Sequence, residues 1–268
     1  GTPPEYFKSF GIDMDRVIHT PITDVEQLKF DITNQLNDLD KKDNVCIVID
    51  SIGNLASKKE VDDALDGKSV ADMSRAKQMK SLFRIVTPHL NLKDIPLICV
   101  NHTYKEIGLF PKDIVSGGTG AYYSADAIWI IGRRQEKEGT EIKGYHFVVN
   151  IEKSRHVREK SQIPITVTFD GGIMKWSGLL EVAEKAGYVH KPKVGWYEAL
   201  NPETGEVLSD KMMRAKEIVD NKDFWLMMFE KTNLAKHIEK VYTIASSAGL
   251  ISDDSQIEIA DEEIVAND

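Results

Sequence analysis

Two short runs of apolar residues, NVCIVID and IPLICVN, constrain the fold of this chain more than any other feature. The first run ends at Asp50 and is followed by Ser51, and the second ends at Asn101 and is followed by His102. Each run is too short to cross a membrane and too uniformly apolar for a strand with one wet face, so each predicts a strand of a parallel sheet that is covered on both faces. Because residues 70–89 show helical spacing between them, the strand, helix, strand order places both carboxyl ends at one sheet edge. Ligands of α/β proteins bind at this edge.

The acid that closes the first run has two interpretations. A carboxylate in the place of Asp50 commonly holds Mg²⁺ through water beside a nucleotide phosphate, as the Walker B acid does. Alternatively, Asp50 caps the turn that follows it. Spacing alone favours neither interpretation, since short motifs match many unrelated sequences.

Charge is distributed unevenly along the chain. The 268 residues carry a net charge of −9, which looks unsuited to a protein that binds nucleic acid. Residues 251–268, however, hold seven acids and no Lys or Arg, which leaves 36 acids against 34 basic residues in the rest. A nearly neutral body can carry local basic patches. We expect the acidic tail to be disordered, either as an interaction segment or as solubilising charge.

The cysteines and the absence of targeting signals bear on the compartment. Cys46 and Cys99 lie in apolar runs without a CxxC partner, so they are predicted to be buried free thiols rather than a metal site or a disulfide. No stretch reaches the roughly 20 apolar residues that a membrane span needs, and the N-terminus shows no signal pattern. These features predict a reducing, cytoplasmic setting.

The remaining patterns predict an α/β chain with a smaller C-terminal region. The expected elements are a helix at 3–10, a strand at 16–20, a helix over 23–39 that opens on a Thr23-x-x-Glu26 capping box, a mobile polar loop at 51–69, a helix at 70–89, a second long loop at 103–120, and strands at 145–151 and 163–169 around the basic turn EKSRHVREK. One or two amphipathic helices follow in FWLMMFEKTNLAKHIEKVYTIASSAGL, whose Met and aromatic residues are expected to pack rather than to bind. Long loops are uncommon in compact domains unless they are functional, and both of these leave the ligand-facing edge.

Seven motifs occur in a fixed order: IVIDSIGNLASKKE, MKSLFRIVTP, VNHTY, SGGTG, YSAD, EKSR and FDGGI. Their joint order resembles the RecA-type recombinases, and most closely the UvsX-type recombinases of T-even-type bacteriophages. The resemblance extends from about residue 1 to about residue 250. It implies a RecA-like ATPase core at residues 1–175 with a central, mostly parallel sheet flanked by helices, a small α-rich C-terminal region at 176–250, and the acidic tail at 251–268.

For the nucleotide, the resemblance implies ATP and Mg²⁺ as cofactors. Asp50 matches the Walker B acid, which would hold the metal, and Ser51 matches the hydroxyl beside it. Asn101 and His102 end the strand that senses the γ-phosphate, where bacterial members have Gln in place of His102. A neutral His offers a different set of donors and acceptors from Gln. Tyr6 matches the aromatic residue that stacks on adenine.

For DNA, the resemblance implies two binding loops, at about 53–69 and about 103–118. The residues expected to bind nucleic acid are Lys58, Lys59, Lys105, Phe110, Lys112, Gly117 and Gly118. A single strand would be held mainly through its phosphates, with little sequence preference. For Lys105 and Lys112 an ordinary surface role is equally compatible with the sequence, since most exposed lysines have no site role.

Lys153 and Arg155, in the turn EKSRHVREK, match a pair of cations that a neighbouring filament subunit directs at the γ-phosphate. That role needs fixed positive charge where negative charge builds during phosphoryl transfer. Two other interpretations are a solvated hairpin turn and a patch that tracks DNA phosphates.

One departure from the family is an absent motif. No G-x-x-x-x-G-K-[ST] occurs in the sequence, and that loop cradles the β and γ phosphates in such enzymes. In the family, the loop and the glutamate that orients the attacking water lie just upstream of the segment that matches Gly1. We therefore expect this chain to be a fragment that binds ATP poorly and hydrolyses essentially none by itself.

The function that the resemblance implies is that of a DNA-dependent ATPase that forms filaments on single-stranded DNA and promotes pairing and strand exchange with double-stranded DNA. It also implies self-association, as a helical filament or a dimer, and work with mediator and single-strand-binding proteins. One alternative is a replicative-helicase-type motor on the same core. Another is a non-catalytic DNA-binding protein that modulates filaments. A Ser/His/Asp hydrolase is disfavoured because no G-x-S-x-G elbow is present.

Overall fold

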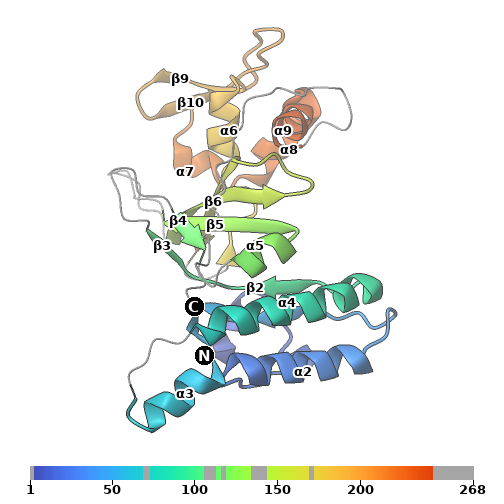
Figure 1. Cartoon of the computed structure of the whole chain (residues 1–268). Helices are drawn as coiled ribbons and strands as arrows, with labels where there is room; N and C mark the ends of the chain where they lie inside the picture. The colour runs from blue at the N-terminus through green and yellow to red at the C-terminus, as the bar shows by residue number, and fades with distance from the viewer. Residues whose placement is uncertain are drawn as a thin grey trace, which may run out of the picture.

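The computed structural model describes residues 3–68, 73–105, 113–115, 119–133, 144–168 and 172–243. Figure 1 shows helices α2 and α4 at one end of this part of the chain, a four-stranded sheet in the middle and the C-terminal helices at the other end. Within these ranges no helix has the length and apolar character that crossing a membrane requires.

The N-terminal end is built around two long helices and one pair of strands. Its elements are α1 (Pro4–Ser9), the 3-10 helix η1 (Met14–Arg16), α2 (Val25–Asp38), β1 (Ile47–Ile49), the 3-10 helix η2 (Ile52–Asn54), α3 (Lys58–Leu65), α4 (Ser74–Lys93) and β2 (Leu97–Cys99). The helices predicted at 3–10, 23–39 and 70–89 are thereby confirmed, with the third displaced four residues toward the C-terminus.

Helix α2 forms where its apolar stripe and its cap agree. Its stripe is buried: Val25, Leu28, Ile32 and Leu36. The cap is Asp24, whose carboxylate accepts a hydrogen bond from the Gln27 N–H at 2.8 Å. The prediction that Thr23 caps this helix is therefore wrong by one residue. The negative charge of Asp24 also interacts favourably with the positive end of the helix dipole.

Strand β1 pairs in parallel with β2, with Ile49 opposite Cys99, as the strand, helix, strand order predicts. The core beneath this pair is formed with α2 and α4, and Ile49 is buried in it. On the other face Val48, Ile98 and Val100 are 60%, 54% and 43% exposed. The prediction that both faces are covered is therefore wrong for the described residues, and the two runs alternate in burial although all their residues are apolar.

The two free thiols differ in their surroundings. Cys46 is exposed, because it precedes β1 instead of lying in it, so the prediction that it is buried is wrong. Cys99 lies in β2 and is partly buried. Burial raises the pKa of the Cys99 thiol to about 11.

Two segments depart from their predicted structure. Residues 16–20 form no strand: η1 ends at Arg16, and Ile18 is 93% exposed, so the segment has no packing to hold it in a sheet. The polar segment 51–69 is not a patternless loop, because it contains η2 and α3. Ser57 caps α3 by accepting a hydrogen bond from the Glu60 N–H at 3.0 Å. The sequence did not predict helix α3, because the helix buries no apolar stripe that would show helical spacing.

The middle of the molecule is antiparallel. Its elements are β3 (Thr103–Lys105), β4 (Asp113–Val115), α5 (Thr119–Ser124), β5 (Ala127–Arg133), β6 (Gly144–Ser154), β7 (Gln162–Thr168) and β8 (Gly172–Ile173). Strands β5 to β8 form one sheet in sequence order, which confirms the two strands predicted around the basic turn. Strand β3 pairs with β4, so the predicted long loop 103–120 contains a short hairpin. The predicted α/β class is confirmed, with β1 and β2 as the parallel pair in the described ranges.

The C-terminal region has a core of its own. It contains α6 (Leu179–Lys185), β9 (Val189–Lys193), β10 (Trp196–Ala199), α7 (Ala215–Ile218), α8 (Lys222–Lys231) and α9 (Leu234–Tyr242). The expectation that its aromatic and Met residues pack is confirmed: Phe224, Trp225 and Met228 of α8 are buried. The indole N–H of Trp225 donates to the carbonyl of Ile218 at 3.0 Å, which satisfies its polar atom. The domain limits at 175/176 and 250/251 stay predictions, and the tail at 251–268 lies outside the described residues.

Candidate functional site

The polar residues that follow β1 and β2 lie at the same edge of the sheet. The backbone bonding of the parallel pair continues past both strands, because the Val100 N–H donates to the Ile49 carbonyl at 2.9 Å and the Ile52 N–H donates to the Val100 carbonyl at 2.9 Å. Asp50 is therefore carried beside the segment that leads into His102. The shared edge predicted from the strand order is confirmed.

His102 is held by the turn that follows Asp50. Its Nε2 lies 2.9 Å from Oδ1 of Asn54, and its backbone N–H donates to Oδ1 of Asn101 at 2.8 Å. The ring also lies against Gly53, where an added Cβ would overlap Cδ2 of the imidazole and come within 3.1 Å of Oδ1 of Asn101. Glycine at residue 53 is thus what lets the ring approach the backbone so closely.

The side chains next to Asp50 suit a hydrated cation that is shared with phosphate. The Asp50 carboxylate is exposed at the edge, and the hydroxyl of Ser51 is buried without a hydrogen-bond partner among the described residues. A buried hydroxyl without a partner is costly, and a ligand at this edge would supply one. Among the same residues no group of three or more His, Cys, Asp and Glu could hold a metal by itself. One carboxylate and one hydroxyl fit Mg²⁺, which keeps several waters and takes phosphate oxygens.

Arg75, at the start of α4, fastens the turn that carries Gly53 and Asn54. Its Nε donates to the Leu55 carbonyl at 2.6 Å, and its Nη2 donates to the Ile52 carbonyl at 2.7 Å. Sequence reasoning missed both Arg75 and Asn54. No local signal marks either residue, because each acts across 20 or more positions of the chain.

Tyr6 does not join this group through any contact found among the described residues. It lies on α1, half of its surface is exposed, and its ring meets that of Phe10 edge to face at 5.1 Å between centroids. Phe10 in turn lies against Gly172 of β8. The stacking role expected of Tyr6 stays a prediction.

Lys153 and Arg155 lie where β6 meets its turn, and both face the end of α5. The Lys153 ammonium donates to the carbonyl of Tyr122 at 2.8 Å and lies 5.4 Å from the centre of its ring. Arg155 forms an ion pair with Asp126 at 2.9 Å, in which 73% of the Arg155 side chain is exposed. Lys153 is therefore pinned, whereas Arg155 is accessible. The expected roles of both residues stay predictions.

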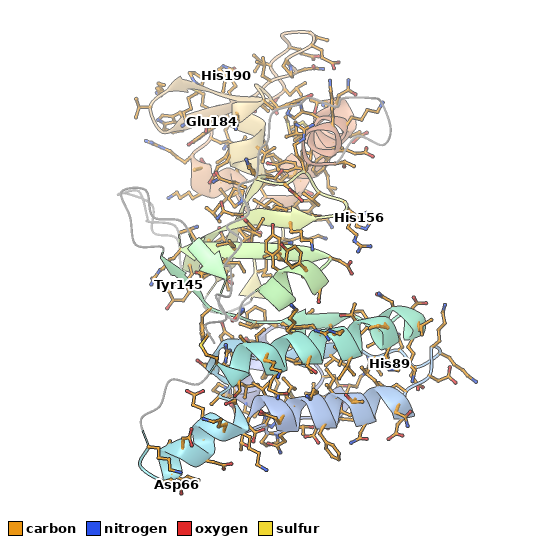
Figure 2. The ribbon with its side chains drawn as sticks, in the orientation of Figure 1. Asp66, His89, Tyr145, His156, Glu184 and His190 are labelled. Atoms are coloured by element: carbon orange, nitrogen blue, oxygen red, sulfur yellow. The ribbon has the colours of Figure 1, made fainter. Side chains whose placement is uncertain are left out.

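The residues expected to bind DNA are only partly within the described ranges. Lys58 and Lys59 open α3, where Lys59 pairs with Asp63 at 2.8 Å. Figure 2 shows Asp66, directly after α3, at the extremity of the molecule. The backbone of Lys105 lies in β3. The other expected residues lie outside the described residues: Phe110, Lys112, Gly117 and Gly118.

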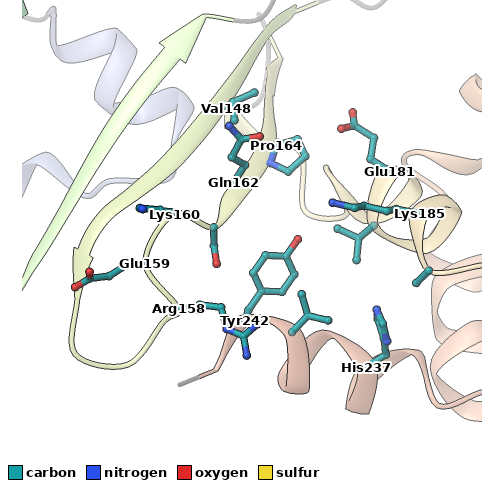
Figure 3. Close-up of a pocket in the computed structure, with 14 residues that line it drawn as sticks. Val148, Arg158, Glu159, Lys160, Gln162, Pro164, Glu181, Lys185, His237 and Tyr242 are labelled. Atoms are coloured by element: carbon teal, nitrogen blue, oxygen red, sulfur yellow. The ribbon is translucent and has the colours of Figure 1, made fainter. Parts of the chain in front are cut away.

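A groove of about 740 Å³ lies away from this edge, between the β6–β7 turn and the C-terminal helices α6 and α9. Figure 3 shows Tyr242 between these elements, and the Arg158 N–H donates to its carbonyl at 2.7 Å. Burial, and then the charge of Glu181, raise the pKa of the Tyr242 phenol. None of the predicted site residues lines this groove, whose walls come from the β6–β7 turn and from the C-terminal region.

The parallel pair with polar residues at its carboxyl edge, followed by an antiparallel extension and a separate small core, defines a RecA-like α/β protein. Residues 2–174 match the family model described as the RecA N-terminal domain. Residues 176–238 match the one described as the C-terminal domain of the bacteriophage T4 recombination and repair protein. The chain belongs to the RecA family.

Individual relatives agree with this assignment. The chain is 50% identical over 249 residues to the recombination and repair protein of Enterobacteria phage T4, an alignment that covers 92% of this chain and 63% of that protein. It is 25% identical over 258 residues to Protein RecA of Streptomyces coelicolor, covering 95% of this chain and 64% of that protein. The chain thus spans a little under two thirds of the length of these relatives.

Proposed function

We propose that the full-length protein containing this chain is an ATP-dependent recombinase, which forms filaments on single-stranded DNA and promotes pairing and strand exchange with double-stranded DNA. The observation that carries the proposal is the shared edge: Asp50 and Ser51 follow β1, and Asn101 and His102 follow its parallel neighbour β2. The names of the relatives, a recombination and repair protein and Protein RecA, support the same function.

The proposed division of labour places the cofactor at this edge. Asp50 would hold Mg²⁺ through water, Ser51 would give the neighbouring hydroxyl, and Asn101 and His102 would contact the terminal phosphate of ATP. When it is bound, the magnesium ion neutralises charge on the phosphates. Tyr6 would stack on the adenine. No G-x-x-x-x-G-K-[ST] occurs in this sequence, so we propose that the chain by itself binds ATP weakly and does not hydrolyse it.

The proposed DNA contacts come from the two segments that leave the edge. The turn that fixes His102 leads directly into α3, which begins at Lys58. A change at the phosphate can therefore reach the first segment through a short path of side chains. The second segment contains Lys105, Phe110, Lys112, Gly117 and Gly118, which we propose contact the DNA backbone and bases.

Arg155 suits a role between subunits of a filament. A cation that acts on the nucleotide of a neighbouring subunit must be accessible at the surface, and most of the Arg155 side chain is exposed. Lys153, fixed on the carbonyl of Tyr122, would be the less mobile member of the pair. We also propose that the protein works with mediator and single-strand-binding proteins, in the cytoplasm of the host cell if it is phage-encoded.

The test compares three proteins: the full-length gene product, its Asp50→Asn variant and its Asp38→Asn variant. Asp38 ends α2 and is exposed, so it is a matched control for the loss of one carboxylate. We expect the wild-type and control proteins to release phosphate in response to single-stranded DNA and to exchange strands, and Asp50→Asn to do neither. Hexameric rings that unwind a forked duplex without exchanging strands would favour a helicase-type motor. DNA binding without nucleotide hydrolysis in the full-length protein would favour a non-catalytic filament modulator.

A further inference from the structure

Asn54 and His102 lie 48 positions apart in the sequence, and their side chains connect the two segments that leave the sheet edge. Oδ1 of Asn54 lies 2.9 Å from Nε2 of His102. With Oδ1 of Asn54 facing the ring, the carboxamide oxygen accepts and Nε2 donates, which corresponds to the tautomer with the proton on Nε2. In a neutral imidazole the other nitrogen, Nδ1, is then an acceptor. In this tautomer the one N–H group of the ring is thus engaged by Asn54.

The backbone around Asn54 is built to keep this pair together. Gly53 leaves the space in which the imidazole lies, since a Cβ there would overlap the ring. Arg75 binds the carbonyls on both sides of Asn54, those of Ile52 and Leu55. On the other side, the His102 N–H is bonded to Oδ1 of Asn101. The backbone that carries Asn54 is therefore fastened, and both side chains of the pair are exposed at the sheet edge.

A phosphate oxygen can only accept a hydrogen bond, so it needs the same kind of donor that Asn54 now engages. We propose that Asn54 is a positioning residue for His102: it holds the single N–H of the neutral ring, and a terminal phosphate must compete with it for that proton. When the His102 N–H donates to a phosphate oxygen instead of to Oδ1 of Asn54, the side chain of Asn54 is released. The turn that leads into α3 then loses its contact with His102. This inference rests on the proposed function for its nucleotide, but the pairing itself is a property of the described residues.

The first experiment measures the pair directly in this chain. Three-bond couplings across χ1 of His102, observed by NMR, report whether its side chain holds one rotamer. We expect one rotamer in the wild-type chain, averaging in Asn54→Ala, and one rotamer again in Asn54→Asp, which keeps an oxygen acceptor. Asn91→Ala, an exposed asparagine on α4, is the matched control and should behave as the wild type. Unchanged couplings in Asn54→Ala would overturn the proposal.

The second experiment measures coupling in the full-length protein. The quantity is the ratio of the Kd for single-stranded DNA without nucleotide to the Kd with a non-hydrolysable ATP analogue. Loss of one hydrogen bond should lower this ratio by about three- to ten-fold in Asn54→Ala. Asn54→Asp and Asn91→Ala should retain most of the wild-type ratio.

The two experiments separate the inference from the proposed function. If the wild-type protein shows no nucleotide-dependent DNA binding, the proposed function fails, and the NMR couplings still decide whether Asn54 positions His102. If the couplings change in Asn54→Ala while the DNA ratio keeps its wild-type value, a role for Asn54 in communication is refuted. Gly53→Ala gives an independent check, because it should displace the ring by steric overlap and lower the DNA ratio without removing Asn54.

Discussion

Removal of the Arg75 side chain should loosen the turn that positions His102. Arg75 donates two hydrogen bonds, to the carbonyls of Ile52 and Leu55, at 2.7 and 2.6 Å. Hydrogen bonds that involve a charged group contribute about 1.5–3 kcal/mol each. Since Arg75 is only partly buried, solvent weakens these bonds, and we take about 1–2 kcal/mol for each, or about 2–4 kcal/mol for the pair. Arg75→Ala should therefore reduce the free energy of local opening of this turn by that amount.

Native-state hydrogen exchange is the appropriate assay, because it measures local opening without requiring the two cores to unfold together. The reporters are the amides of Ile52 and Leu55, which donate to the carbonyls of Val100 and Ile52 at 2.9 and 3.3 Å. At about 1.4 kcal/mol per tenfold change, Arg75→Ala should speed their exchange by about 30- to 1000-fold.

Two further variants make the measurement specific. Arg75→Lys keeps the charge, but a single ammonium cannot bond both carbonyls as the planar guanidinium does. The increase in exchange rate should therefore be smaller than in Arg75→Ala. Arg84→Ala removes an exposed arginine from the same helix and should leave both amides unchanged. Exchange of Ile52 and Leu55 in Arg75→Ala within about two-fold of the wild type would refute the reasoning, since charged hydrogen bonds of this length would then contribute nothing to the turn.

Three other outcomes follow from the structure. Trp225→Ala should destabilise the C-terminal region by about 3–5 kcal/mol, because the Trp225 side chain is fully buried. Leu226→Ala should cost little, because Leu226 is 45% exposed. Urea unfolding followed by near-ultraviolet circular dichroism measures both losses of stability, and equal losses would contradict the packing. Burial raises the pKa of the Cys99 thiol to about 11, so at pH 8 only about one molecule in a thousand carries the Cys99 thiolate. A thiol reagent should therefore react quickly with the exposed Cys46 alone until the pH approaches 11. Equal reaction rates of the two thiols at pH 8 would contradict this expectation. In the full-length protein, Arg155→Ala should lower the DNA-dependent ATPase rate by about 1000-fold. The thermal unfolding midpoint should shift by less than about 2 °C, because the Arg155–Asp126 ion pair is exposed. A larger shift of the midpoint would indicate a structural role for Arg155.

Elements with a strong apolar period were predictable from the sequence. The stripe of α2 and the alternation in β6 and β7 locate those elements because burial of one face repeats at the helical or the strand period. The shared edge of Asp50 and His102 was predictable for a similar reason, since two apolar runs joined by a helix leave few topologies.

Elements held by polar or distant contacts were not predictable. Helix α3 rests on the cap at Ser57 and on the Lys59–Asp63 pair, not on an apolar face, so its sequence looked like a loop. The bond between Asn54 and His102 depends on the geometry of two separate turns. Sequence spacing has no means of indicating such a contact, which explains why the edge was predicted while the residue that fixes its histidine was missed.

The outward face of β1 and β2 has a consequence for how this chain behaves at high concentration. Val48, Ile98 and Val100 present part of their side chains to water on this face. Two such surfaces that meet release ordered water, so copies of the chain should attract one another and scatter more light as the concentration rises. The same surface should bind a dye such as ANS, and a charged residue in place of Val48 should weaken both effects while leaving the buried side of the sheet intact.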